Sequence, residues 1–155
     1  MTRRIITGNN AEGKSYIAAD ETVSDMYVWQ SIAGDPMGAS PDGAPTRLLP
    51  STAPHIEPPA GGSKCARVEI QPWKVMKPIL EKGIPGLDAN GFHRTATVDY
   101  IMVVSGEVKL LLDEGDTIVR AGDLVVQRNT NHAWHNLGDG PADLWGVMVS
   151  MLPAL

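Results

Sequence analysis

The part of the chain after Phe92 is built from short apolar runs separated by turn residues, and this pattern constrains the fold more than any other feature. The runs are too short for stable helices, and glycine, aspartate or asparagine punctuates the segments between them. Strands are predicted over residues 98–104, 108–112, 117–119, 124–126, 132–136 and 143–150. Several short strands with frequent turns indicate an antiparallel sandwich or barrel. The sequence therefore predicts an all-β fold.

The earlier part of the chain predicts further strands over residues 3–7, 14–19, 26–32 and 63–71, with a loop between the second and the third. The only helix expected is a single turn near residues 79–82. The segment 34–62 is crowded with proline and glycine, so we expect an irregular arm that either covers a pocket or embraces a second subunit. We expect one domain overall, with N-terminal strands and arm over 1–62 and the barrel over 63–155.

Composition excludes several classes of protein. A formal charge of -5 argues against a nucleic-acid partner, because phosphates need a basic face. No window approaches the ~20 apolar residues of a membrane span. The single cysteine, Cys65, forms no internal disulfide, and its place in a predicted strand favours a buried thiol over a nucleophile. We therefore expect a cytoplasmic protein.

Polar side chains gather at the start of one predicted strand. Alternation places His93, Thr95, Thr97 and Asp99 on one face of that strand, and the same face becomes apolar further along. Such a strand is typical of a barrel with a functional mouth and a packed floor. A second histidine, His132, begins a later strand that would lie beside it.

These residues resemble the two conserved motifs of the cupin superfamily, the small jelly-roll β-barrels. The first motif is G(X)5HXH(X)3,4E(X)6G. His93 and Thr95 stand at its two histidine positions, Asp99 at the glutamate position, and Gly106 at the final glycine. The resemblance covers roughly the last two-fifths of the chain, and it implies a cupin-type double-stranded jelly-roll barrel.

The second cupin motif ends in a histidine and an asparagine with three residues between them, which His132 and Asn136 match. The turn from Ala121 to Asp123 resembles the PGD turn that precedes this histidine in the family. His135 falls on the opposite face of the strand from His132, so only His132 is expected in the site.

The first motif departs from the family at two positions. Cupins that bind metal commonly use three histidines and a glutamate, whereas this chain has Thr95 and the shorter Asp99. The resemblance thus implies His93, Asp99 and His132 as metal ligands, a set that suits Fe(II) or Zn²⁺, with Mn and Ni also possible. The alternative is a site without metal, in which His93 and Asp99 form an acid/base or hydrogen-bonded pair.

The resemblance implies a small enzyme, acting on a small oxygenated organic substrate by oxidation, decarboxylation, dehydration or isomerisation. The alternative is a metal-free cupin that binds a small molecule as a sensor or storage module. Cupins pair through their outer sheet, so a homodimer is expected. The candidate catalytic residues are His93, Thr95, Asp99 and His132, and the candidate substrate-binding residues are Gln127, Trp134, Arg128, Trp73 and Met76.

Two of these candidates have a competing interpretation. Arg128 either holds a substrate carboxylate through its guanidinium or is a surface residue. Trp134 either forms an apolar wall beside His132 or belongs to the core.

Overall fold

The computed structural model describes residues 1–31, 33 and 56–152. The predicted arm falls largely on residues 34–55, with His55 among them, and that part lies outside the described residues. The all-β prediction is confirmed. The elements are β1 (Thr2–Asn9), β2 (Ser15–Val23), β3 (Tyr27–Ser31), β4 (Ser63–Ile70), α1 (Trp73–Leu80), β5 (Thr97–Ser105), β6 (Glu107–Leu112), β7 (Asp116–Arg120), β8 (Leu124–Arg128), β9 (His132–His135) and β10 (Ala142–Ser150).

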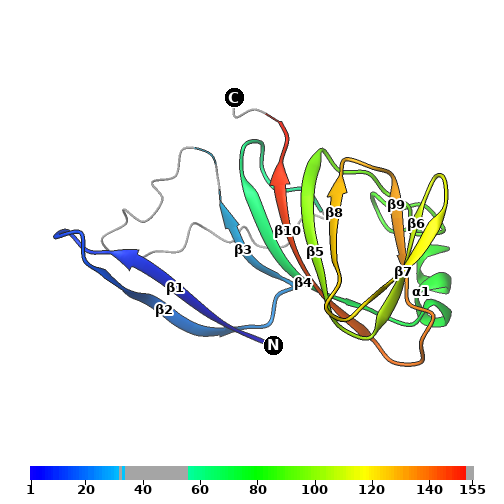
Figure 1. Ribbon diagram of the computed structural model, residues 1–155, viewed down its shortest axis with the longest axis horizontal. Helices are drawn as coiled ribbons and strands as arrows, with labels where there is room; N and C mark the ends of the chain where they lie inside the picture. The colour runs from blue at the N-terminus through cyan, green and yellow to red at the C-terminus, as the bar shows by residue number, and fades with distance from the viewer. Residues whose placement is uncertain (32, 34–55, 153–155) are drawn as a thin grey trace.

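Two antiparallel sheets form the body of the molecule (Figure 1). The larger sheet has the strand order β3-β4-β10-β5-β8, and the smaller has the order β7-β6-β9. Strands distant in the sequence are therefore neighbours, as where β10 lies between β4 and β5. The β1–β2 ribbon projects away from these sheets (Figure 1). Arg4 links it to the larger sheet, because its guanidinium donates to the carbonyl of Val28 at 2.8 Å.

Two local predictions were wrong. The segment expected to be a loop after Ala19 continues as strand β2 to Val23, because β1 lies opposite and supplies hydrogen-bond partners along the whole ribbon. The helix begins earlier and is longer than the single predicted turn. Trp73, Met76 and Leu80 recur at helical spacing and give α1 one face that packs inward, which decides its extent.

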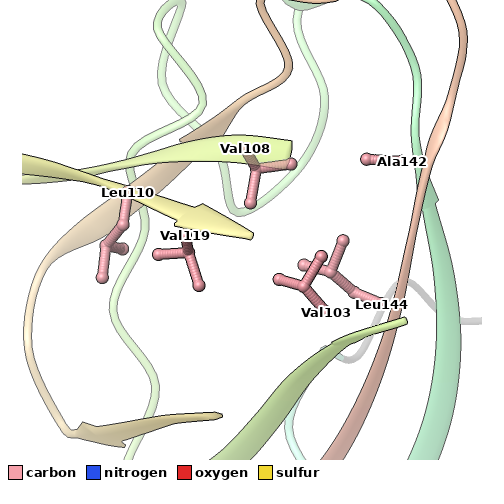
Figure 2. Close-up of a cluster of buried hydrophobic side chains, with 6 residues drawn as sticks. All are labelled: Val103, Val108, Leu110, Val119, Ala142 and Leu144. Carbon is pink, nitrogen blue, oxygen red and sulfur yellow. The ribbon is translucent and has the colours of Figure 1, made fainter. Parts of the chain in front are cut away.

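The apolar core lies between the two sheets (Figure 2). Strand β5 shows how the sequence builds it. Val103 is fully buried, while its neighbours Met102 and Val104 are 47% and 49% exposed. This is the alternation that extended backbone imposes. The core residues are Val103, Val108, Leu110, Val119, Ala142 and Leu144.

The outer face of the larger sheet is also apolar, yet it is exposed. Tyr100 pairs with Val126 on one side and with Val147 on the other. These three side chains are 48%, 51% and 39% exposed. The same face carries further exposed apolar side chains on the same three strands: Met102, Val104, Leu124 and Val149.

Candidate active site

The structure brings His93 and His132 into contact. They form an antiparallel bridge in which each backbone N–H donates to the other residue's carbonyl at 3.0 Å. The centroids of the two imidazole rings lie 4.3 Å apart, with the planes inclined by 50°. His93 precedes β5, which begins at Thr97, so it sits on a short bridging segment rather than on one unbroken strand.

Both imidazoles are oriented by the backbone. Nδ1 of His93 lies 3.1 Å from the carbonyl of Gly91, and Nδ1 of His132 lies 2.9 Å from the carbonyl of Thr130. A carbonyl only accepts, so this geometry places a proton on Nδ1 of each ring and leaves Nε2 as the nitrogen that a metal ion would use. Burial lowers the pKa of His132 to about 4, so the ring is neutral at pH 7. A neutral imidazole held in this way is suited to binding a metal ion.

Asp99 supplies a buried carboxyl group on the same inner surface. It is 4% exposed, and its Oδ1 has no hydrogen-bond partner. Burial raises the pKa of Asp99, while a hydrogen bond from Thr97 and the charge of His93 act in the opposite direction. Thr97 is also bound to Thr95, hydroxyl to hydroxyl, at 2.7 Å. Thr95, Thr97 and Asp99 are therefore linked by hydrogen bonds.

Gln127 lies directly opposite Asp99, on the neighbouring strand β8. It is 4% exposed, its Nε2 is bonded to the hydroxyl of Thr130, and its Oε1 has no partner. A hydroxyl both donates and accepts, so either end of the amide is able to face Thr130. The other end then faces the surface that carries Asp99. Thr130 thereby contacts both Gln127 and, through its carbonyl, His132.

The donor chemistry suits a divalent metal, since two imidazoles and a carboxylate are the set found in non-haem Fe(II) sites. The unpartnered Oδ1 of Asp99 also fits a metal site. A buried acceptor without a donor costs about 1–3 kcal/mol, and a bound cation would remove that cost. In the described part of the chain, however, no three His, Cys, Asp or Glu side chains are grouped closely enough to hold a metal ion. The structure thus pairs the histidines and places Asp99 nearby, without completing a three-ligand set.

The other predicted site residues are divided between the site and its surroundings. Trp134 packs against the core, and its ring lies edge-on to His132 with the centroids 6.3 Å apart. Trp73 stacks on His135, with ring centroids 3.6 Å apart, and so contacts the histidine that faces away from His132. Met76 lies half-buried on α1, and Arg128 is exposed on the outward-facing side of β8. Cys65 is half-buried, and burial raises the pKa of its thiol.

Two inward-facing polar residues were not predicted as part of the site. Lys64 is 5% exposed, and Gln30, its partner across β3 and β4, is 6% exposed. The signal for Lys64 was present in the sequence, because alternation places it on the same side of β4 as Ala66 and Val68. A lysine that shares the apolar face of a strand points to a buried amine.

Comparison with known proteins places the chain in a family. A cupin-domain family model matches residues 83–150. Over 98% of its length the chain is 32% identical to the cupin-domain-containing oxidoreductase virC of Hypocrea virens, and the match covers 77% of that protein. The chain belongs to the cupin family. The cupin jelly-roll fold implied by the motifs at His93–Gly106 and His132–Asn136 is thereby confirmed.

Further cupin relatives share shorter stretches. The chain is 39% identical over 100 residues to phomopsin biosynthesis cluster protein C' of Diaporthe leptostromiformis, a match that covers 64% of this chain and 43% of that protein. Among solved structures, an RmlC-like cupin from Methanocaldococcus jannaschii aligns with a TM-score of 0.42 at 14% identity, over 57% of this chain and 70% of that one. Within the described residues, no helix is long and apolar enough to cross a bilayer.

Proposed function

We propose that this cupin is a small oxidoreductase acting on a small oxygenated organic molecule. The support for the reaction class comes from relatives, since virC of Hypocrea virens and srdD of Neurospora crassa are both named cupin-domain-containing oxidoreductases. The single structural observation that carries the proposal is the imidazole pair. His93 and His132 lie 4.3 Å apart with both Nδ1 atoms on backbone carbonyls, beside a buried carboxyl group.

We further propose that the enzyme uses a divalent metal held by His93, His132 and Asp99, with Fe(II) as the first choice and Zn²⁺ next. Binding requires the Asp99 carboxylate to come closer to the two rings than it lies here. When bound, Fe(II) in such a set retains open positions for a substrate or O₂. The side chains of the protein hold the metal, exclude water and position the substrate.

Each side chain has a physical task in this proposal. His132 stays neutral at pH 7 because burial lowers its pKa, so its Nε2 lone pair is available as a ligand. Thr97 donates to Asp99 and favours its ionised form, which a cation requires. Trp134 excludes water on the side of His132 that faces the core. Gln127 presents one end of its amide beside Asp99, where it either donates to the carboxylate or accepts from a ligand.

The test is anaerobic titration of the chelator-treated protein with Fe(II), followed by addition of nitric oxide. We expect about one iron per chain and an S = 3/2 electron paramagnetic resonance signal, because nitric oxide reports an open position on bound Fe(II). Protein that binds no iron and gives no such signal would rule out the metal-dependent enzyme.

A second function is favoured by one observation. The three expected ligands do not form a metal-holding group, and Thr95, at the position of the missing histidine, is bonded to Thr97. A metal-free cupin that binds a small organic molecule is consistent with this arrangement. A chelator-treated protein that retains full affinity for its ligand favours this binding module, whereas affinity that requires metal favours the enzyme.

A further inference from the structure

A row of polar side chains crosses the inner surface of the larger sheet. Register places Gln30 opposite Lys64, Lys64 opposite Met148, Met148 opposite Asp99, and Asp99 opposite Gln127. The row therefore includes one residue from each of the five strands, in the order β3, β4, β10, β5 and β8. Its four polar members are each between 4% and 6% exposed. Four buried polar side chains in one line are unusual for a sheet face turned toward a core.

The two ends of the row have opposite hydrogen-bonding character. At the β3 and β4 end the groups donate, because Gln30 presents a buried Nε2 that has no partner and Lys64 presents an amine. At the β5 end Asp99 presents a buried Oδ1 that also has no partner, and Oδ1 accepts when the carboxyl group is ionised. Met148 lies between the two ends and contributes a flexible apolar surface.

Lys64 is held at its end of the row. Its Nζ lies 2.9 Å from the carbonyl of Glu57 and 3.4 Å from the carbonyl of Ile56, and it lies 4.3 Å from the centre of the Tyr27 ring. These contacts fix the position of a positive charge beside the amide of Gln30. A carboxylate is the group that best matches an amide N–H beside a fixed ammonium.

We propose that this row is the substrate-binding track of the enzyme, and that it selects an organic acid whose carboxylate lies on Gln30 and Lys64 while its oxygenated reactive end lies at Asp99. This inference rests on the proposed function, because it uses Asp99 as the reactive end. Adjacent strands lie about 4.8 Å apart, so Lys64 and Asp99, two strands apart, stand about 10 Å from one another. The track therefore fits a molecule with a carboxylate, an apolar middle and a second oxygen group about 10 Å away.

Three probes of matched length test the track: 8-hydroxyoctanoate, which has both polar ends, octanoate, which has only the acid, and 1-octanol, which has only the hydroxyl group. Binding is measured by calorimetry on the full chain. We expect 8-hydroxyoctanoate to bind most tightly and 1-octanol at least about tenfold more weakly, since hydrogen bonds to a charged group are stronger than neutral ones. Equal binding of the acids and the alcohol, or no binding of either acid, overturns the proposal.

The variant Gln30→Leu removes the unpartnered donor and keeps similar volume. We expect it to weaken both acids about tenfold and to leave 1-octanol unchanged. The control is Gln71→Leu, the same change at a half-buried glutamine outside the row, which should leave all three probes unchanged. If Gln30→Leu does not fold, Gln30→Glu replaces it, because a carboxylate at this position repels an acid but not an alcohol. Wild-type affinities for the acids in the folded variant contradict the track.

Iron content measured on the same preparations separates this inference from the proposed function. Loss of acid binding in Gln30→Leu with iron content retained supports the track. Acid binding that depends on Gln30 in a protein that never holds iron leaves the track intact and rejects the metal-dependent oxidoreductase.

Discussion

His93 and His132 exchange both of their backbone hydrogen bonds, each at 3.0 Å, although they come from different segments of the chain. This bridge holds the two imidazole rings together independently of any ligand. Because Nδ1 of each ring also lies on a carbonyl, little side-chain freedom remains to be lost on binding. The pair is therefore preorganised, and Asp99 is the member that has to adjust.

The first prediction concerns metal content. His132→Gln should reduce bound metal from about one ion per chain to well below half, because the two remaining ligands, His93 and Asp99, hold a divalent ion weakly. His135→Gln is the matched control, since His135 lies on the same strand but stacks on Trp73. Elemental analysis after loading with Zn²⁺ and gel filtration measures the effect. Equal metal in the two variants would contradict the proposed ligand set.

The second prediction concerns stability at low pH. The pKa of His132 is about 4 in the folded protein, against an ordinary value of 6.5, so the unfolded chain binds more protons between these values. The free energy of unfolding therefore falls as the pH drops through 6.5, by about 2 kcal/mol between pH 7 and pH 5. Asp99 has the opposite effect on the free energy of unfolding. Burial raises its pKa, so the folded protein takes up this proton more readily than the unfolded chain as the pH falls.

Urea denaturation in the presence of a chelator, at pH 7, 6 and 5, measures this dependence. In the variant His132→Gln, the free energy of unfolding should fall less between pH 7 and pH 5, because the imidazole no longer contributes. An identical pH dependence in wild type and variant would mean that another group, and not His132, is responsible.

The third prediction concerns the final glycine of the first motif. Gly106 has a φ of +77°, and a Cβ there would lie 3.0 Å from Cβ and 3.1 Å from Cα of Ala142. Gly115 has a φ of +88° but nothing within 4 Å of its Cβ position. Gly115→Ala should therefore cost about 1 kcal/mol from backbone strain alone, and Gly106→Ala about 2–3 kcal/mol in total. Equal losses in urea denaturation would show that the contact with Ala142 is relieved at no cost.

The fourth prediction concerns self-association. We propose that the apolar outer face of the larger sheet, around Tyr100, Val126 and Val147, is covered by the same face of a second copy. Exposed apolar patches of this kind mark interfaces, and a twofold dimer pairs a patch with itself. Val126→Lys should shift the protein from dimer to monomer in analytical ultracentrifugation. The control Val75→Lys changes an exposed valine on α1 and should leave the dimer intact. A wild-type monomer at micromolar concentration would refute the proposal.

Several features of the site were predictable from the sequence because they depend on local geometry. Strand alternation correctly separated Asp99 and Val103, which are buried, from Tyr100 and Met102, which are exposed. It also separated His132 from His135, and the structure gives the two histidines different partners. The extent of α1 was not predictable in this way, because Pro78 and the surrounding glycines obscure a helix whose inner face is decided by packing.

The sequence by itself determined the all-β class, the cupin motifs and the side of each strand on which a residue lies, because a two-residue period is a property of extended backbone alone. Only the tertiary structure decided that Gln30, Lys64 and Asp99 share one row, and that Nε2 of Gln30 and Oδ1 of Asp99 are left without hydrogen-bond partners there. The order and register of strands depend on packing summed over the whole sheet. They cannot be predicted from any local pattern in the sequence.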